Sequence, residues 1–246
     1  MIIAAAQTIP TRQNISQNLD DHYRLANLAA DYGGQLIVFP EMSLTGYERE
    51  LAAELSFVEN DPRLDPLRNL ANERNIIILA GAPILLKSGL HIGMFILKPN
   101  QSEIIYTKQY LHDGEEIWFV PGKVNDLIIN LESERISPAI CADITNPAHP
   151  ARAASLNSTL YIASIFYTPN GIFQGLNDLA HYAKTLSMNV LMSNYGGDSY
   201  GLASGGKSSF WQSDGELIGG FDGIGKGLLI VEREDSQWKS KVVQTI

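Results

Sequence analysis

The chain has 246 residues, of which 45% are hydrophobic, so it can bury the core of one large α/β domain or of two small ones. Asp and Glu outnumber Lys and Arg by 27 to 18, and the net charge of −9 argues against nucleic acid or an anionic membrane as a partner. The single cysteine excludes an internal disulfide and a Cys-x-x-Cys metal site. The N-terminal residues lack the basic region and length of a signal peptide, and no apolar run approaches the roughly 20 residues of a membrane-spanning helix, so we expect a cytoplasmic protein.

Apolar runs and their spacing predict strands and helices in the first half of the chain. Residues 14–30 carry apolar side chains on one helix face, with Asn14 as the N-cap and Gly33-Gly34 as the stop. The predicted helices are 14–30 and 65–74, and the predicted strands are 2–8, 36–39, 76–80, 91–97 and 103–106. We expect a turn at Gly81-Ala82-Pro83 and a loop at 110–122.

The second half largely repeats this order. Strands are predicted at 127–131, 135–141, 159–166, 190–193, 208–212 and 227–231, and helices at 150–157 and 173–186. The residues after 231 have the character of a terminal tail, and no linker divides the chain. We therefore expect residues 1–246 to form a single α/β domain of two similar halves, with helix layers covering the sheet faces.

Three polar residues directly follow apolar, strand-like runs: Glu41, Lys108 and Cys141. Taken singly, each has a structural explanation, as a helix cap, a solvated strand end or a small buried hydrophobe. Because strand ends at one edge of a sheet converge, the three can also meet in one site. There the carboxylate would take the thiol proton, and the ammonium would favour the thiolate and stabilise the oxyanion formed when it attacks a carbonyl-type carbon.

The sequence around these residues resembles the nitrilase superfamily of carbon–nitrogen hydrolases, whose catalytic residues are Glu, Lys and Cys. The matching motifs, in the family's order, are Val-Phe-Pro-Glu41-Met-Ser-Leu-Thr-Gly46-Tyr47, Tyr106-Thr-Lys108-Gln-Tyr-Leu111 continuing to Phe119-Val-Pro121-Gly122, and Ile140-Cys141-Ala-Asp143. The resemblance implies a four-layer α-β-β-α sandwich and a thioester mechanism, with Cys141 as nucleophile, Glu41 as general base and Lys108 as oxyanion stabiliser. It also implies a small-molecule amide substrate, no cofactor and a homodimer.

The superfamily also carries a second glutamate in the loop after the lysine, where Glu115 and Glu116 stand side by side. Spacing to the Phe-x-Pro-Gly element favours Glu115, in a supporting role that positions water and the lysine, and leaves Glu116 as the alternative. By the same resemblance, the backbone N–H of Ala142 is a further oxyanion donor.

Other polar residues near the motifs have simpler explanations. Asp143 is expected to hold the loop or to cap the following helix. A rival pairing of Cys141 with His112 or His149 lacks an orienting motif. The five histidines show no paired ligand spacing, so we expect no metal site.

Two positions depart from the pattern of many amidase-like members, which carry an aromatic residue after the cysteine and an arginine two residues after the aspartate. This chain has Ala142 and Thr145 there. The missing arginine puts carboxylate-bearing substrates in doubt. Ala142-Asp143 also differs from the Trp-Glu pair of nitrilases, which favours amide over nitrile hydrolysis. Nitrile hydrolysis by the same triad and a non-catalytic binding or regulatory role are the alternatives.

Substrate contacts are expected from residues that adjoin the motifs, because aromatic walls with few polar groups are typical of a small-ligand pocket. These residues are Tyr47, Trp118, Ala142, Phe166, Tyr167 and Asn194. Ordinary packing is the alternative explanation for the aromatic residues and for Asn194, and the substrate itself cannot be named from them.

Overall fold

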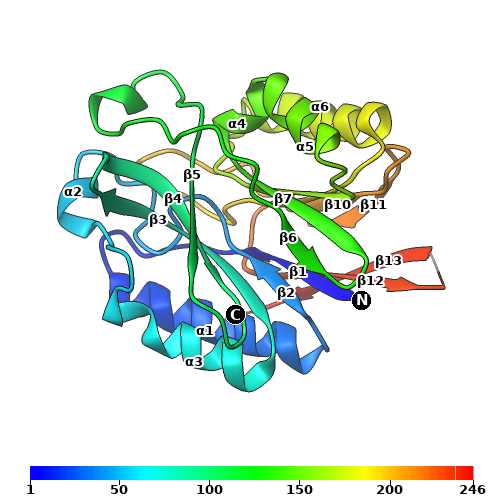
Figure 1. The fold of residues 1–246 in the computed structure, drawn as a ribbon, viewed down its shortest axis with the longest axis horizontal. Coiled ribbons are helices and arrows are strands. Elements are labelled where there is room, and N and C mark those ends of the chain that lie inside the picture. Colours follow the sequence, from blue (N-terminus) through cyan, green and yellow to red (C-terminus); the bar gives the residue numbers. More distant parts are fainter. Residues whose placement is uncertain (236, 246) are drawn as a thin grey trace.

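The computed structural model describes residues 1–235 and 237–245, which form two β-sheets packed face to face between layers of helices (Figure 1). The first sheet has seven strands in the order β13 (Gln237–Gln244), β12 (Gly227–Glu234), β1 (Ile2–Gln7), β2 (Leu36–Val38), β3 (Ile77–Leu86), β4 (Gly89–Leu97) and β5 (Ile104–Thr107). The second has six in the order β11 (Leu217–Gly220), β10 (Ser209–Trp211), β9 (Asn189–Ser193), β8 (Leu160–Ser164), β7 (Glu134–Ile140) and β6 (Ile129–Leu131). The predicted α-β-β-α sandwich is confirmed.

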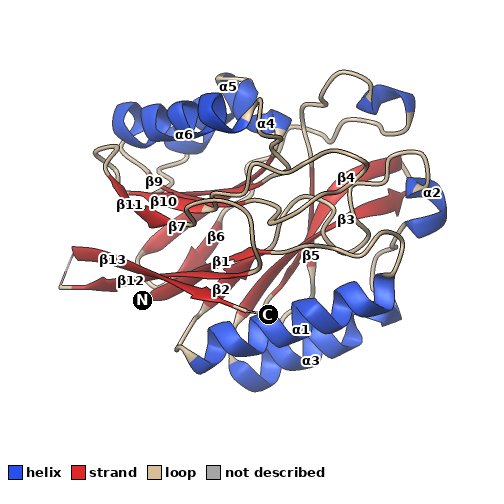
Figure 2. Ribbon diagram, turned by 180° about the vertical axis from the view of Figure 1, so that it is seen from behind, coloured by secondary structure: helices blue, strands red, loops and turns tan. Residues whose placement is uncertain are grey.

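Helices cover the outer face of each sheet (Figure 2). The first sheet carries α1 (Ile15–Asp31) and α3 (Asp65–Arg74), and the second carries α5 (Ala148–Ser155) and α6 (Ile172–Leu186). Two short helices, α2 (Ala52–Leu55) and α4 (Ala142–Thr145), follow β2 and β7. Among the described residues, no helix is both long and apolar enough to cross a bilayer.

Each sheet has a parallel centre, with β1–β2–β3 in the first and β7–β8–β9 in the second. Helix α1 connects β1 to β2, and α6 connects β8 to β9, so each half of the chain contributes the same β-α-β arrangement. Central parallel strands are covered on both faces, which explains why they consist of nearly continuous apolar residues.

Helix α1 begins and ends where its sequence indicates. The side chain of Asn14 accepts a hydrogen bond from the N–H of Gln17 at 3.1 Å, which satisfies one of the free donors of the first turn. Gly33 has a φ of +79°, which lets the chain reverse, and the N–H of Gly34 returns to the Ala29 carbonyl at 2.8 Å. The predicted helix and both of its ends are therefore confirmed.

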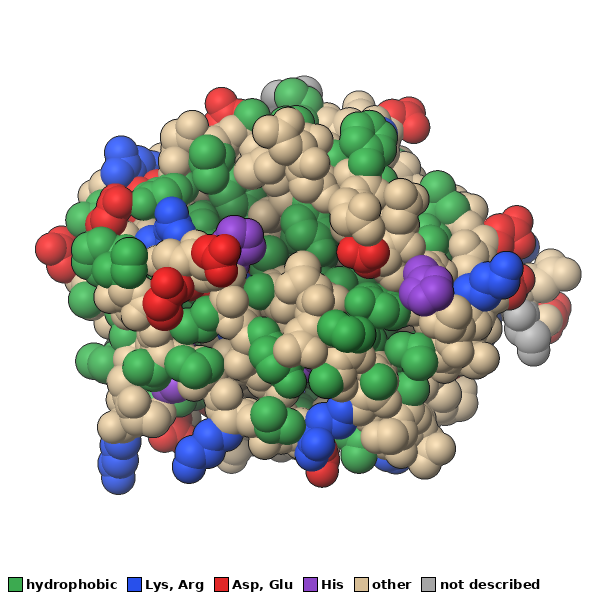
Figure 3. Space-filling model, turned by 90° about the horizontal axis from the view of Figure 1, so that it is seen from above, with side chains coloured by type: hydrophobic (Ala, Val, Ile, Leu, Met, Phe, Trp, Pro, Cys, Tyr) green, Lys and Arg blue, Asp and Glu red, His purple; other side chains and the backbone are tan. Residues whose placement is uncertain are grey.

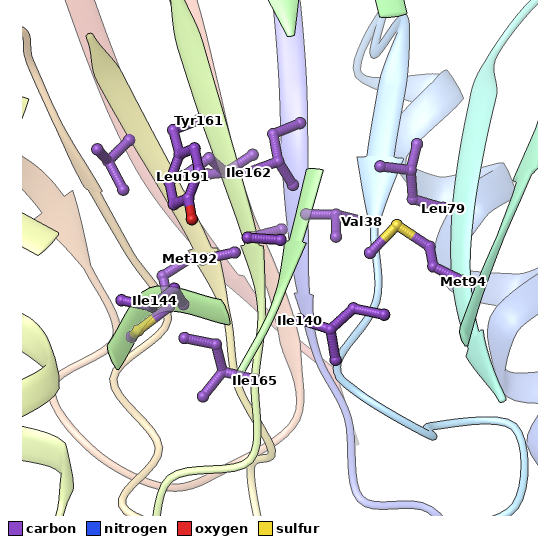
Figure 4. Close-up of a cluster of buried hydrophobic side chains, with 14 of the residues drawn as sticks. Val38, Leu79, Met94, Ile140, Ile144, Tyr161, Ile162, Ile165, Leu191 and Met192 are labelled. Atoms are coloured by element: carbon purple, nitrogen blue, oxygen red, sulfur yellow. The ribbon is translucent and has the colours of Figure 1, made fainter. Parts of the chain in front are cut away.

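The main hydrophobic core lies between the two sheets (Figure 4). Val38 and Leu79 project into it from the first sheet, and Ile162 and Leu191 from the second, each with no exposed surface. Complete burial of such a side chain stabilises the fold by roughly 1.5–3 kcal/mol. This packing fixes how the strand ends of one sheet lie against those of the other.

The turn predicted at Gly81-Ala82-Pro83 is wrong, because β3 continues through these residues and pairs with β4 along its whole length. Gly81 is needed for a different reason. A β-carbon at this position would lie 2.5 Å from the Pro40 carbonyl oxygen and 2.6 Å from the Met42 nitrogen. The missing side chain therefore lets the segment that carries Glu41 lie directly against β3.

The terminal tail predicted after residue 231 is also wrong. These residues extend β12 to Glu234 and form β13, which pairs antiparallel with β12 at the edge of the first sheet. Strand β13 is half exposed and contains Lys239 and Lys241, a composition that suits an edge strand but carries little hydrophobic signal. Strand β11 and helix α2 were not predicted either, because both are short and flanked by turns.

We expect Gly81→Ala to lower the free energy of unfolding by about 1–3 kcal/mol, because the added methyl group overpacks the contact between β3 and residues 40–42. Urea unfolding measures the change. Gly223→Ala is the matched control, since a β-carbon there meets no atom within 4 Å and both substitutions stiffen the unfolded chain alike. Equal stability of the two variants would contradict the close contact.

Candidate active site

A lysine ammonium held between two carboxylates lies where the ends of β2 and β5 meet. Glu41 follows β2, Lys108 follows β5, and Glu115 comes seven residues after the lysine. The Nζ atom of Lys108 donates to Oε1 of Glu41 at 2.7 Å and to both carboxylate oxygens of Glu115 at 2.7 Å. All three side chains are buried, with at most 1% exposed surface. These charges can be buried because the single ammonium is bound by both carboxylates.

Cys141 sits at the sharp turn between β7 and α4. Its φ is +40° and its ψ is −97°, a backbone conformation that L-residues with a side chain rarely adopt. The turn is held by the Cys141 N–H, which donates to the Ser164 carbonyl at 3.1 Å. Strained residues of this kind cluster at functional sites, where the surrounding structure imposes the conformation.

The charges around the thiol set the protonation states of the site. Burial raises the pKa of Glu41 to about 7, although Lys108 opposes the rise and Glu115 adds to it. Burial, together with the negative charge of Glu41, raises the pKa of the Cys141 thiol well above its usual value. Burial alone would lower the pKa of Lys108, but the surrounding Glu41, Cys141 and Glu115 outweigh it and raise that pKa. The resting site therefore contains a neutral thiol and an ammonium.

One oxygen of Glu41 remains available to accept a proton. Its Oε1 atom binds Lys108, whereas Oε2 is buried and has no well-formed hydrogen bond to any described residue. The Cys141 thiol lies close enough to the carboxyl to lower the Glu41 pKa as a hydrogen-bond donor. The backbone N–H of Phe166 points at the sulfur and lowers the thiol pKa, so it favours the thiolate once the proton has left.

Glu115 is the glutamate that enters the site, and Glu116 is not. Besides Lys108, the Glu115 carboxylate accepts a short hydrogen bond from the Tyr47 hydroxyl and one from the His112 N–H at 2.7 Å. Glu116 is exposed and accepts from the Gly114 N–H in the loop. Glu115 therefore holds the lysine in place, and it fixes Tyr47 beside the same cluster.

Asp143 joins the lysine segment to the cysteine turn. Its Oδ1 atom accepts from the N–H groups of Gln109 and Tyr110 at 2.8 and 2.9 Å, directly after Lys108. Its Oδ2 atom accepts from the Ile140 N–H at 3.0 Å and from the Tyr106 hydroxyl at 2.7 Å. Four donors thus converge on one buried carboxylate, which holds the loop as the sequence indicated.

A cavity of about 420 Å³ opens beside the thiol, within the size range of small-molecule sites. Of the predicted substrate contacts, the four that line it are Tyr47, Ala142, Phe166 and Tyr167. Ala142 is also the first residue of α4, where a backbone N–H has no partner inside its own helix. Figure 3 looks down on this side of the molecule. Hydrophobic, acidic, basic and histidine side chains are intermixed there, and neither charge sign dominates the face.

The structure does not bring two of the predicted contact residues to the cavity wall. Trp118 is 42% exposed and lies outside the cavity lining. Asn194 is fully buried, accepts from the Tyr167 N–H at 2.9 Å and donates to the Gly206 carbonyl at 2.7 Å. Asn194 therefore holds the backbone behind the cavity, because its amide is already used by main-chain partners.

The two histidines considered as rivals occupy other places. The ring of His149 bridges the hydroxyls of Tyr106 and Tyr161 at 2.8 and 2.7 Å. The ring of His112 lies at the cavity wall, and its Nδ1 atom is 3.2 Å from the Asp113 carbonyl. Neither ring is paired with Cys141 among the described hydrogen bonds. No three His, Cys, Asp or Glu side chains of the described residues gather as metal ligands.

Sequence reasoning missed residues that support the site from distant segments. The Tyr195 hydroxyl donates to the Glu41 carbonyl at 2.6 Å, and the Ser164 hydroxyl donates to the Phe39 carbonyl at 2.8 Å. Both bonds connect the second half of the chain to the segment that carries the carboxylate. Neither residue stands in a distinctive local sequence pattern. Each hydrogen bond joins residues more than a hundred positions apart, so only the folded structure reveals it.

We expect Asp143→Asn to lower kcat at least tenfold with little change in KM. The amide group would place its own N–H donors against two of the four donors that now meet the carboxylate, which costs about 1–3 kcal/mol and shifts the lysine relative to the cysteine. Steady-state kinetics and thermal unfolding measure both effects. Asp20→Asn, on the exposed face of α1, removes the same charge as a control, and an unchanged kcat in Asp143→Asn would show that this carboxylate does not position the site.

The similarity to solved structures and to characterised proteins is consistent with this geometry. An amidase of the nitrilase superfamily from Nesterenkonia AN1 superposes with a TM-score of 0.86 at 24% identity, over 96% of this chain and 91% of that one. Another structure of the Nesterenkonia amidase, after removal of its tag, superposes with a TM-score of 0.85 over 96% and 94% of the two chains. At this identity the likeness establishes the fold.

Sequence relatives match parts of this chain at 26–29% identity. The glutamine-dependent NAD(+) synthetase of Thermotoga maritima is 28% identical over 182 residues, which are 68% of this chain and 30% of the synthetase. A nitrilase of Pyrococcus abyssi is 26% identical over 165 residues, 65% of this chain and 63% of the nitrilase. Each match therefore spans less than two thirds of the relative. The model of the carbon-nitrogen hydrolase family, by contrast, matches residues 2–240, and the chain belongs to this family.

Proposed function

We propose that the protein hydrolyses the C–N bond of a small linear amide through a thioester on Cys141. The observation that carries this proposal is the Lys108 ammonium, bound by Glu41 and Glu115 next to the thiol at the wall of a 420 Å³ cavity. A buried base, a buried cation and a lone thiol beside an open space are the groups that acyl transfer requires. The stability of the fold does not require a carboxylate, an ammonium and a thiol to be gathered at one cavity.

Acylation begins with a neutral thiol, because the pKa of Cys141 is raised well above its usual value. Glu41 takes the thiol proton as the sulfur attacks the amide carbon, and the C–S bond forms while the carbonyl oxygen becomes an oxyanion. Lys108 and the Ala142 N–H stabilise that oxyanion. Protonated Glu41 then gives its proton to the leaving nitrogen, the C–N bond breaks, and ammonia or an amine departs from the thioester.

Deacylation repeats the same steps with water. Glu41 removes a proton from a water molecule, whose oxygen attacks the thioester carbon, and the returning proton restores the Cys141 thiol as the acid product leaves. The pKa of about 7 suits Glu41 to both directions of transfer. Glu115 stays bound to Lys108 throughout and holds the ammonium in position.

Amide hydrolysis is favoured over nitrile hydrolysis by the residues that follow the cysteine. Ala142-Asp143 differs from the Trp-Glu pair of nitrilases, and Asp143 is fully used as an anchor for the loop. The Nesterenkonia protein is named an amidase, and in one of its structures acrylamide has added to the active-site cysteine. The Pyrococcus abyssi relative is named a nitrilase, so nitriles are the alternative that the experiment must include.

The experiment compares matched pairs of small amides and nitriles by ammonia release and by the mass of the protein. We expect amide turnover, an acyl adduct on Cys141, and complete loss of both in Cys141→Ala. Lys108→Met should lower kcat by at least about a thousandfold, because the oxyanion loses its main cation. Faster turnover of the nitriles would identify the protein as a nitrile hydrolase, and full activity of Cys141→Ala would exclude the thioester mechanism.

The pH dependence provides a second prediction. Glu41 must be ionised to accept the thiol proton, so kcat/KM for a neutral amide should rise with pH through an apparent pKa of about 7. Glu115 raises the Glu41 pKa, and Glu115→Gln should therefore move this acidic limb to lower pH in the activity that remains. Initial rates from about pH 5 to 9 test both statements. A limb that does not move in Glu115→Gln would show that another group controls it.

A further inference from the structure

We propose that Arg49 binds an anionic group of the substrate, so that the substrate is a short linear amide that also carries a carboxylate. The inference rests on the proposed amide hydrolysis and specifies its substrate class. Arg49 lines the same cavity as Cys141, and it comes two residues after Tyr47, whose hydroxyl is bonded to Glu115. A guanidinium at this place presents a permanent positive charge to whatever occupies the cavity.

Aromatic rings hold the Arg49 side chain at the cavity wall. Its guanidinium carbon lies 4.8 Å from the centre of the Tyr200 ring and 5.7 Å from the centre of the Tyr47 ring. Stacking of this kind fixes the orientation of the guanidinium plane, and the Tyr200 hydroxyl is within hydrogen-bonding reach of one of its N–H groups. The Nε atom is buried and has no hydrogen-bond partner among the described residues.

The acids beside Arg49 in the sequence are bound to other groups. Glu48 pairs with Arg12 at 2.9 Å, and Glu50 accepts from the Tyr200 hydroxyl at 2.5 Å. No carboxylate of the described residues lies within 4.0 Å of the Arg49 nitrogens, in contrast to the ion pairs that Arg12, Arg63, Arg68 and Arg74 form. An arginine that lines a ligand cavity without an ion pair can use its terminal N–H groups to bind a carboxylate of the ligand.

The rest of the cavity restricts where a negative charge can go. Asp113 and Asp178 also line it and repel a carboxylate, and Arg49 is the one lysine or arginine among the described lining residues. Thr145, also at the wall, stands where many amidase-like relatives carry an arginine, and it uses its hydroxyl to bind the Ala142 carbonyl at 2.9 Å. Arg49, in the segment after β2, would supply the positive charge that Thr145 lacks at this cavity. The proposal therefore favours carboxylate-bearing substrates, which the residue at position 145 had put in doubt.

Kinetics with charged and neutral amides of equal length test the proposal. We expect succinamate or glutaramate to have a higher kcat/KM than butyramide or valeramide in the unaltered protein. In Arg49→Gln, kcat/KM for the two anionic amides should fall roughly 10- to 100-fold, the usual loss for a charge-assisted hydrogen bond, while the neutral amides keep theirs. Arg49→Lys should retain part of the preference because it keeps the charge. Arg24→Gln, on the exposed side of α1, is the control for general charge loss.

Binding separates this proposal from the proposed reaction. Calorimetry with Cys141→Ser protein should show that succinamate or glutaramate binds and that Arg49→Gln weakens this binding roughly 10- to 100-fold, whether or not any amide is hydrolysed by the unaltered protein. Absence of turnover together with Arg49-dependent binding would overturn the reaction and support the anion site. Equal loss for charged and neutral amides in Arg49→Gln, a preference for neutral amides, or binding that does not depend on Arg49 would overturn the anion site.

Discussion

The buried ammonium of Lys108 is the constraint on which the rest of the structure depends. A cation with no exposed surface needs negative partners at hydrogen-bond distance, and Glu41 and Glu115 supply them from two different segments. Removal of Lys108 would leave two buried carboxylates without their cation, at a cost of several kcal/mol. Burial of Cys141 raises the pKa of its thiol, and the negative charges of Glu41 and Glu115 add to that rise although Lys108 opposes it, so Cys141 rests as a thiol.

The sandwich brings the site together, because Glu41, Lys108 and Cys141 each follow the end of a different strand. The core between the sheets sets the relative position of the strand ends, and the bonds of Ser164 and Tyr195 fasten the Glu41 segment to the second half. Asp143 does the same for the segments of Lys108 and Cys141. The strained backbone at Cys141 is maintained by these connections, since an isolated chain would relax from a φ of +40°.

Local pattern predicted the elements with strong hydrophobic signals and failed where the signal was weak or ambiguous. The buried strands and α1 were predicted because apolar runs and a helical period are directly visible. Gly81 and Pro83 were taken for a turn, although Gly81 is used for close packing against residues 40–42. Strand β13 was missed because an edge strand buries little surface, and its pairing with β12 is visible only in the folded sheet.

For the site, the sequence by itself determined which reactive residue types are present and their order along the chain. These are an acid, a lysine and a cysteine, each after an apolar strand and within motifs that resemble one family. It also ranked Glu115 above Glu116, which agrees with where the two carboxylates lie. Only the tertiary structure decided that backbone groups occupy the Asn194 amide, that Trp118 lies outside the cavity, and that Arg49 lines it without an acidic partner among the described residues. The physical reason is that pairing, burial and pKa depend on neighbours that are distant along the chain, whereas residue type and local period do not.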